Sequence, residues 1–346
     1  MPVRSFADTS AVSLAYAIAD ATTPAEVTAA APQFSYLPFT TEGFNMAKEA
    51  KASTAITNDR RPNNSKNTKG SASGATTLEF GATPFIQDML ALGLMSEWAL
   101  VDEVDASAGS FITDSDLKRF MVFEKTTKGG PEATDNLYHE RYYGTMINDF
   151  TMEFGDGELI TLALNTISTF ADYASAVAGA NGLGGSIATT KAVPADYEVA
   201  DSSNNLKNLI IKDSQGTPLE MTFSDASLQV QNNVREQPGL GHEFAAGVGV
   251  GKVGVSLSGE IYYFDQTVLD AHMTNKRLSG ELTLDTVDGT YTVYLPNLVA
   301  QSPSNSADGE NQDYKTSITL TAEKGEVTIG ALTVVCAIAI TYLAKP

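Results

Sequence analysis

The sequence predicts a mainly β protein in which two similar modules follow one another, each a β-sheet with one short flanking α-helix. Three observations lead to this expectation. Apolar and polar residues alternate along most periodic stretches, two short stretches have helical spacing, and similar motifs recur in the same order in both halves. The chain has 346 residues, of which 42% are hydrophobic, so it can bury a core.

The strand prediction rests on period-two patterns rich in β-branched and aromatic residues. They are clearest at residues 120–124, 148–154, 253–257 and 291–295. Three glycines, Gly157, Gly289 and Gly325, follow Asp or Lys between such runs. Each can supply the positive φ that a tight hairpin turn needs.

Two helices are predicted, at about residues 84–92 and 266–276. Thr83 can cap the first, Pro84 suits its first turn and Gly93 can end it; Asp265 is the cap candidate for the second. In both, apolar residues or histidine stand at positions i, i+1, i+4 and i+5, so each helix can lay one apolar face on a sheet.

The order of motifs predicts an internal duplication. Ser73-Gly74 and Ser258-Gly259 each stand in a strand that leads to a helix. Residues 120–125 then match 291–296, 150–154 match 318–322, and 159–164 match 327–332. We therefore expect a first module with an N-terminal arm at 1–170 and a second module at 219–346. Residues 171–218, rich in Ala, Ser, Asn and Thr, are expected to be a loosely ordered connector or insertion.

Composition excludes several classes of protein. The net charge of −20 repels DNA phosphates, so a DNA-gripping protein is not expected. Cys336 is the single cysteine, which excludes an intrachain disulfide and a cysteine-based metal cage. Residues 327–344 carry no charge and could be a short membrane anchor. β-Branched residues and Gly330 favour buried strands instead.

No catalytic constellation stands out. His139, His242 and His272 have no metal-ligand spacing, and His272 falls on the apolar helix face, which favours a packed histidine. The glycine-rich residues 247–251 lack the helix and lysine of a phosphate loop. Paired carboxylates leave a glycosidase site open, but nothing singles one out. The expectation is therefore no enzyme, no catalytic residue, no metal site and no cofactor.

One segment is basic in this acidic chain. Residues 46–71 form a polar stretch whose six basic residues are Lys48, Lys51, Arg60, Arg61, Lys66 and Lys69. One interpretation is a solvated loop. The other is an arm that contacts an acidic surface of a neighbouring copy, where matched charges favour a particular register.

The motifs resemble those of siphovirus-type bacteriophage tail tube proteins. The opening of that family is similar to residues 34–44 (FSYLPFTTEGF), the polar hairpin with Arg60, and residues 70–80 (GSASGATTLEF) before a helix. The next block is similar to residues 120–125, 142–148 and 157–161. The second half resembles the family at residues 228–233, 251–260 and 294–296, and the order of these motifs is the specific part.

The resemblance implies tail-tube-type β-sandwich or barrel modules whose sheets join between subunits into a barrel around a tube. It implies a structural virion protein, assembled in the host cytoplasm, whose stacked rings conduct DNA during ejection. Six modules normally form a ring, so a duplicated subunit favours homotrimeric rings with pseudo-sixfold symmetry, with hexameric rings as the alternative. Implied partners are further copies, the tape measure protein and double-stranded DNA transiently in the lumen, and the tail terminator and tail tip proteins; no membrane is implied.

A tube wall needs a strand face that is polar, and alternation provides candidates. Those expected to line the lumen are Ser73, Thr77, Glu79, Glu153, Glu158, Ser256, Ser258 and Glu260. Carboxylates there would repel the DNA backbone; the alternative is an outward solvated face. Two rival functions are a carbohydrate- or receptor-binding β-sandwich of a tail fibre or adhesin, and a capsid or tail-completion protein.

Overall fold

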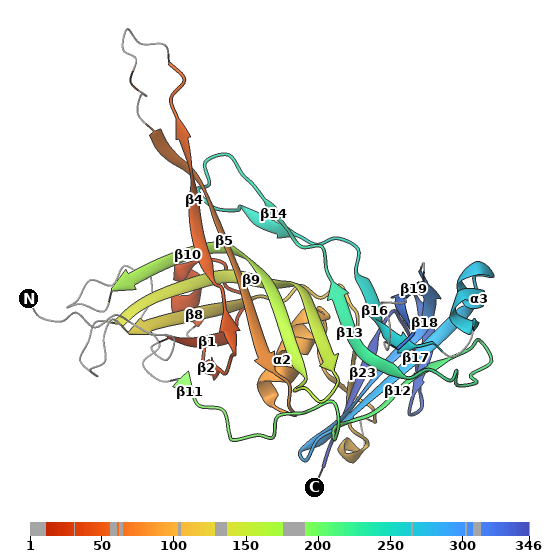
Figure 1. Cartoon of the computed structure of the whole chain (residues 1–346). Helices are drawn as coiled ribbons and strands as arrows, with labels where there is room; N and C mark the ends of the chain where they lie inside the picture. The colour runs from red at the N-terminus through yellow and green to blue at the C-terminus, as the bar shows by residue number, and fades with distance from the viewer. Residues whose placement is uncertain are drawn as a thin grey trace, which may run out of the picture.

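The protein is mainly β. The computed structural model describes residues 12–30, 32–55, 61, 65–102, 105–128, 137–175, 191–263, 266–301, 303–306 and 313–345. Figure 1 shows the first-half strands on one side of the molecule, the second-half strands on the other, and a long hairpin that projects from the first half. The mainly β prediction is therefore confirmed.

Strands of the first half form one antiparallel sheet. Its order is β2-β1-β8-β9-β10-β5-β4, and β3 also pairs with β5. The bounds are β1 (Val12–Ile18), β2 (Phe34–Leu37), β3 (Thr41–Glu42), β4 (Asn45–Ala52), β5 (Ser65–Glu79), β8 (Met121–Lys128), β9 (Leu137–Gly155) and β10 (Thr161–Ser175).

Strands of the second half have the antiparallel order β12-β17-β18-β20-β16-β13. β18 reaches β20 only with residues 298–300, and β19 continues this pairing along β20. The bounds are β12 (Leu206–Lys212), β13 (Phe223–Gln231), β16 (Gly254–Tyr262), β17 (Arg277–Asp285), β18 (Gly289–Ala300), β19 (Ser304–Ser306) and β20 (Lys315–Ala322).

The two halves share one sheet because β13 pairs antiparallel with the C-terminal part of β9. Asn232, just after β13, strengthens this joint. Its buried side-chain amide donates to the carbonyl oxygens of Gly93 (2.8 Å) and Ile147 (3.0 Å). One hydrophobic core accordingly contains residues of both halves.

Alternation gives the joined sheet one apolar face. A single cross-strand row runs through six strands, and every member is at most 1% exposed: Leu78, Leu162, Met152, Leu228, Leu257 and Leu320. Burying such side chains stabilises the fold by about 1.5–3 kcal/mol each, so this row fixes which face turns inward.

The first predicted helix is confirmed as α2 (Pro84–Gly93). The Thr83 hydroxyl accepts a hydrogen bond from the Ile86 N–H (3.3 Å), and Phe85 and Ile86 are buried. A Cβ added at Gly93 would lie 2.5 Å from the Phe150 ring, so glycine lets the helix end approach β9 closely.

The second helix, α3 (Thr267–Met273), is shorter than predicted. Gln266 is its N-cap without a side-chain hydrogen bond, and Asp265 lies outside the described residues. Val268 is buried, but Leu269 is 41% and Met273 74% exposed. His272 is partly buried, with Nδ1 2.9 Å from the Ala300 carbonyl oxygen. The apolar face of α3 is therefore covered only in part.

The remaining elements lie around these sheets. β23 pairs with both β18 and β7, which ties the C-terminal region to the first half. β11 pairs parallel with β2. The bounds are α1 (Pro24–Ala30), β6 (Ala99–Leu100), a 3₁₀ turn (Ala106–Ala108), β7 (Ser110–Thr113), β11 (Lys191–Ala192), β14 (Arg235–Gln237), β15 (Gly247–Gly249), β21 (Gly325–Ile329), β22 (Leu332–Cys336) and β23 (Ala339–Ala344).

Residues 327–344 fall mostly in the strands β21, β22 and β23, as predicted, but the expectation that these strands are buried is wrong in part, since Val335 is 52% and Leu343 47% exposed. In the part of the chain that the structure describes, no helix is long and apolar enough to cross a membrane.

Of the three turn glycines, Gly157 has the expected positive φ (70°), whereas Gly289 and Gly325 begin strands without one. Gly330 (φ 59°) instead makes the β21–β22 turn.

The expectation of a loosely ordered connector at 171–218 is wrong for its described parts. β10 extends to Ser175, and β12 pairs with β17 through Leu209 and Ile211. Lys207 and Asn208 break the apolar run of β12, and its partner strand is about 70 residues away, so local sequence could not reveal the pairing.

A buried charge cluster fastens β11 to the first sheet. Glu124 of β8 is fully buried, and Arg141 of β9 donates to it through Nε (3.1 Å). Lys191 of β11 places Nζ 2.8 Å from Glu124 Oε1. Burial alone would raise the pKa of Glu124, but His139, Lys191 and Arg141 together outweigh it and lower the pKa to about 2.

We predict that Glu124→Gln destabilises the fold by about 3 kcal/mol at neutral pH, because it leaves two buried cations without their counter-charge. The wild-type carboxylate has a lowered pKa, so its stabilisation is present above about pH 4.5 and is lost as pH falls toward 2. Denaturant unfolding of both proteins from pH 7 to 2 should show the difference shrinking with acid. The exposed Glu326→Gln is the matched control, expected within about 0.5 kcal/mol of wild type; a pH-independent gap would contradict the assignment.

Candidate functional site

The face of the sheet opposite the apolar row is polar across both halves. One cross-strand row on it runs through the same six strands: Glu79, Thr161, Glu153, Ser227, Ser258 and Thr319. The next row on the same face lies two residues along each strand and contains Thr77, Ala163, Thr151, Gln229, Ser256 and Thr321. Small hydroxyl residues and carboxylates thus form a continuous surface.

The structure brings together seven of the eight residues predicted from alternation. Ser73, Thr77, Glu79, Glu153, Ser256, Ser258 and Glu260 occupy this one face of one sheet. The eighth, Glu158, stands in the turn between β9 and β10. The residues of β13 were not among the predicted lumen residues. β13 adds Asp225, Ser227 and Gln229 in the middle of the face, and the alternation of polar and apolar residues in its sequence was a usable signal.

The polar face carries more acid than base. Glu153 and Asp225 are exposed, and Glu79 and Glu260 are partly exposed. Lys315 is the basic neighbour of Glu260, with Nζ 3.1 Å from Oε2. The Ser227 and Ser258 hydroxyls, on the paired strands β13 and β16 of the second half, lie 2.9 Å apart and hydrogen-bond to each other. Among the described residues, no group of His, Cys, Asp and Glu could hold a metal ion.

The basic segment forms the β4–β5 hairpin, called the arm here (residues 45–79), which projects from the body in Figure 1. Lys48 Nζ lies 2.5 Å from Glu243, and Lys69 Nζ lies 3.0 Å from Glu236. Both acids belong to the segment between β13 and β16 of the same chain. Sequence reasoning missed them because they lie more than 160 residues away.

The other arm candidates within the described residues are exposed. Lys66 and Arg61 are exposed, and Lys51 Nζ lies 3.8 Å from Glu49 on the same strand. Arg60 lies outside the described residues. Two of the predicted contact residues are therefore bound within the chain, and Lys51 and Lys66 present their charge outward.

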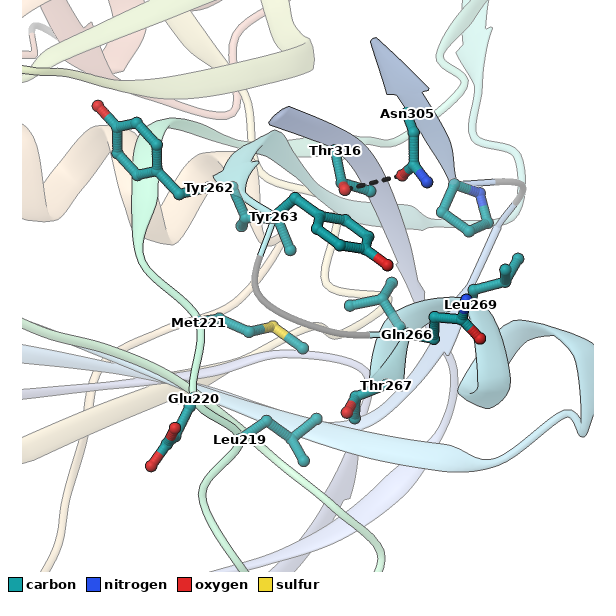
Figure 2. A pocket seen from close by; sticks show the side chains of 13 residues that line it. Leu219, Glu220, Met221, Tyr262, Tyr263, Gln266, Thr267, Leu269, Asn305 and Thr316 are labelled. Carbon is teal, nitrogen blue, oxygen red and sulfur yellow. Dashed lines mark hydrogen bonds between the residues drawn. The ribbon is translucent and has the colours of Figure 1, made fainter. Parts of the chain in front are cut away.

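A pocket lies at the end of the second-half sheet, between α3, the end of β16 and β19 (Figure 2). Met221, Tyr263, Val268 and Leu269 line it together with Pro303 and Asn305. The lining is mixed, because the polar residues Gln266, Thr267 and Thr316 also contribute to it.

Comparison with known families assigns the chain. A family model described as phage tail tube protein matches residues 9–322, which span both halves of the sheet, the arm and the helices α2 and α3. A search among curated proteins found no match. Because the family match covers most of the chain, this protein belongs to the phage tail tube protein family and is a structural component of the virion tail.

Proposed function

We propose that each chain carries two tail-tube modules, that three chains form one ring of a siphovirus-type tube, and that the polar face lines the lumen. The observation that carries this proposal is the β9–β13 pairing, which joins the halves edge to edge with their polar faces aligned. A sheet that continues across modules in this way is the unit from which a closed barrel is built.

Strand order supports two modules. The first half has β1-β8-β9-β10-β5-β4, and the second has β12-β17-β18-β20-β16-β13. Along the chain, the strands follow one another in the same succession in each half, with the helix after the third strand. Six strands and a helix in the same topology twice are hard to explain without duplication.

Local irregularities support the same correspondence. A bulge separates Met121 from Phe123 in the β8–β9 pair, and another separates Leu278 from Gly280 in the β17–β18 pair. In both pairs the bulged strand, β9 or β18, advances by three residues while its partner, β8 or β17, advances by two.

The ends of the third strands agree as well. The Phe80 N–H donates to the Ile160 carbonyl oxygen (2.9 Å), and the Tyr263 N–H donates to the Tyr314 carbonyl oxygen (2.9 Å). This correspondence relates β8 to β17, β9 to β18 and β10 to β20, and it aligns Gly74 with Leu257. It does not support the matches expected from the sequence, which paired residues 120–125 with 291–296, 150–154 with 318–322, 159–164 with 327–332, and Ser73-Gly74 with Ser258-Gly259. It also moves the start of the second module from 219 to about Leu206, because β12 occupies the place of β1.

Charge supports the lumen assignment over an outward solvated face. The apolar side of the sheet is covered by α2 and the core, so only the polar side can border a water-filled channel. Carboxylates on that side repel DNA phosphates, which lets the genome pass without binding. The tape measure protein and duplex DNA would occupy the lumen in turn, and the tail terminator and tail tip proteins would meet the two ends. No catalytic role, cofactor or membrane contact is part of this proposal.

The arm would contact the next ring through its outward charges. Because Lys48 and Lys69 already pair with Glu243 and Glu236, we assign the contact to Lys51 and Lys66. An acidic ring surface is a matching partner, since the chain carries a net charge of −20.

The ring stoichiometry is directly testable. Concentrated protein should form rings and tubes with a central hole in negative-stain microscopy. Native mass spectrometry of single rings should give about three times the chain mass of 36.6 kDa. Six modules from three chains give this mass; rings of six chains would contradict the proposal.

Lumen lining predicts size-dependent protection in tubes. Glu153→Cys should react with a large polyethylene-glycol maleimide in unassembled protein, lose at least tenfold in rate after assembly, and still react with a small maleimide. Lys207→Cys, on the outer strand β12, is the control that should react in both states. Burial, with help from Asp114, raises the pKa of Cys336 to about 12, so the native thiol contributes little. Equal protection at both positions would refute the lumen assignment.

For the arm, we predict that Lys51→Glu combined with Lys66→Glu raises the concentration needed for tube growth on the order of tenfold, about 1.4 kcal/mol per contact. Both residues are exposed, so the melting temperature should change little. Turbidity and sedimentation measure growth. Lys207→Glu, which reverses one exposed charge on β12, is the control. Normal tube growth would show that the arm is not the ring-to-ring contact.

A further inference from the structure

The edge of β19 is open where the corresponding edge of the first half is closed. Asn305 of β19 stands opposite Thr316 in the second residue of β20, and Met152 of β9 stands opposite Leu162 in the second residue of β10. These positions therefore correspond. Met152 is 1% exposed because β13 covers it, whereas Asn305 is exposed and β19 has β20 as its one strand partner among the described residues.

The pocket beneath α3 lies at this open edge (Figure 2). Its lining residues Tyr263 and Pro303 are partly exposed, whereas the corresponding first-half residues Phe80 and Phe150 are 0% exposed. In the first half, β13 places Leu228 beside Met152 and Val230 beside Phe150 on the apolar face. The second half has the corresponding strands and helix, but among the described residues no strand pairs with β19 in the way that β13 pairs with β9.

The chain itself contains a strand of the right kind. β4 corresponds to β13 in strand order, and its outer edge has no strand partner in the described part of the chain. Phe44 lies over Gly74. Gly74 corresponds to Leu257, and the cross-strand partner of Leu257 is Leu228. Phe44 therefore corresponds to Leu228. Met46 then holds the position of Val230, and it is still partly exposed. Phe44 is buried against Phe123 and Tyr142 of its own chain, so Met46 is the apolar side chain available to cover the pocket.

We propose that the edge of β19 and the pocket beneath α3 receive the β3–β4 strand of a second copy. The strands run antiparallel with Phe44 opposite Asn305 and Met46 beside Pro303, which repeats between chains the β13–β9 joint within the chain. This inference rests on the proposed ring and assigns its chain-to-chain contact. Three joints within chains and three between them then close the sheet, and neither β4 nor β19 keeps an open edge.

A disulfide tests the register. Asn45 and Ser304 are both exposed and would face each other across the joint. Opposite residues of antiparallel strands lie about 4.5–5.5 Å apart at Cα, within disulfide range. Rings of the double variant Asn45→Cys, Ser304→Cys should oxidise to covalent dimers and closed trimers. An equimolar mixture of the two single variants should yield mainly disulfide dimers. Lys51→Cys with Ser304→Cys is the control, displaced by about 20 Å along the strand, and should not cross-link.

The possible outcomes distinguish failure of the proposed contact between β4 and β19 from failure of the proposed ring. Rings that cross-link through 45 and 304 but not through 51 and 304 support the proposal. Rings that form without the 45–304 disulfide overturn this contact and leave the ring standing. Protein that forms no rings overturns both.

A substitution gives a second readout. Met46→Asp should abolish rings while the circular dichroism spectrum stays that of a folded chain, and Met46→Leu should assemble like wild type. If the pocket instead held a sugar or another small ligand, Met46→Asp would assemble normally, which would overturn the proposal.

Discussion

The pairing of β13 with β9 is the interaction on which the rest of the architecture depends. It aligns seven residues of each strand, from Asp225 opposite Gly155 to Gln231 opposite Asp149, and merges two sheets into one. Because side chains alternate along a strand, this register sets Leu228 beside Met152 and Ser227 beside Glu153 at once. A slip by one residue would turn Leu228 to water and Ser227 into the core. The apolar face and the polar face of the whole sheet are therefore fixed together.

The two faces of the sheet have different roles. The apolar face holds the fold, through the leucine-rich row and the helix α2, while the acidic polar face stays available to water. Basic residues are placed where they neutralise specific acids. Lys191 and Arg141 surround the buried Glu124, and Lys48 and Lys69 of the arm bind Glu243 and Glu236. A strongly acidic chain can thus be stable and still present a repulsive surface to nucleic acid.

The two halves differ mainly in how completely they are covered. In the first half α2 is buried, and β13 closes the sheet over it. In the second half α3 is short, Leu269 and Met273 are exposed, and β19 has β20 as its one strand partner among the described residues, beside the pocket beneath α3. Exposed apolar surface beside an open strand edge invites pairing with another chain. The asymmetry between otherwise similar halves is what a subunit of a closed assembly would have.

The sequence by itself determined the mainly β class, the alternation that assigns Glu79 and Leu78 to opposite faces, and the start of α2 at its Thr83 cap, because these depend on neighbours within a few residues. It also carried the order of motifs by which the family was recognised. Only the tertiary structure decided that β12 belongs to the second sheet, that β13 lies against β9, and that Glu124, Lys48 and Lys69 have partners from distant segments. Periodicity records which face a side chain takes, but strand partners are chosen by the packing of the whole chain.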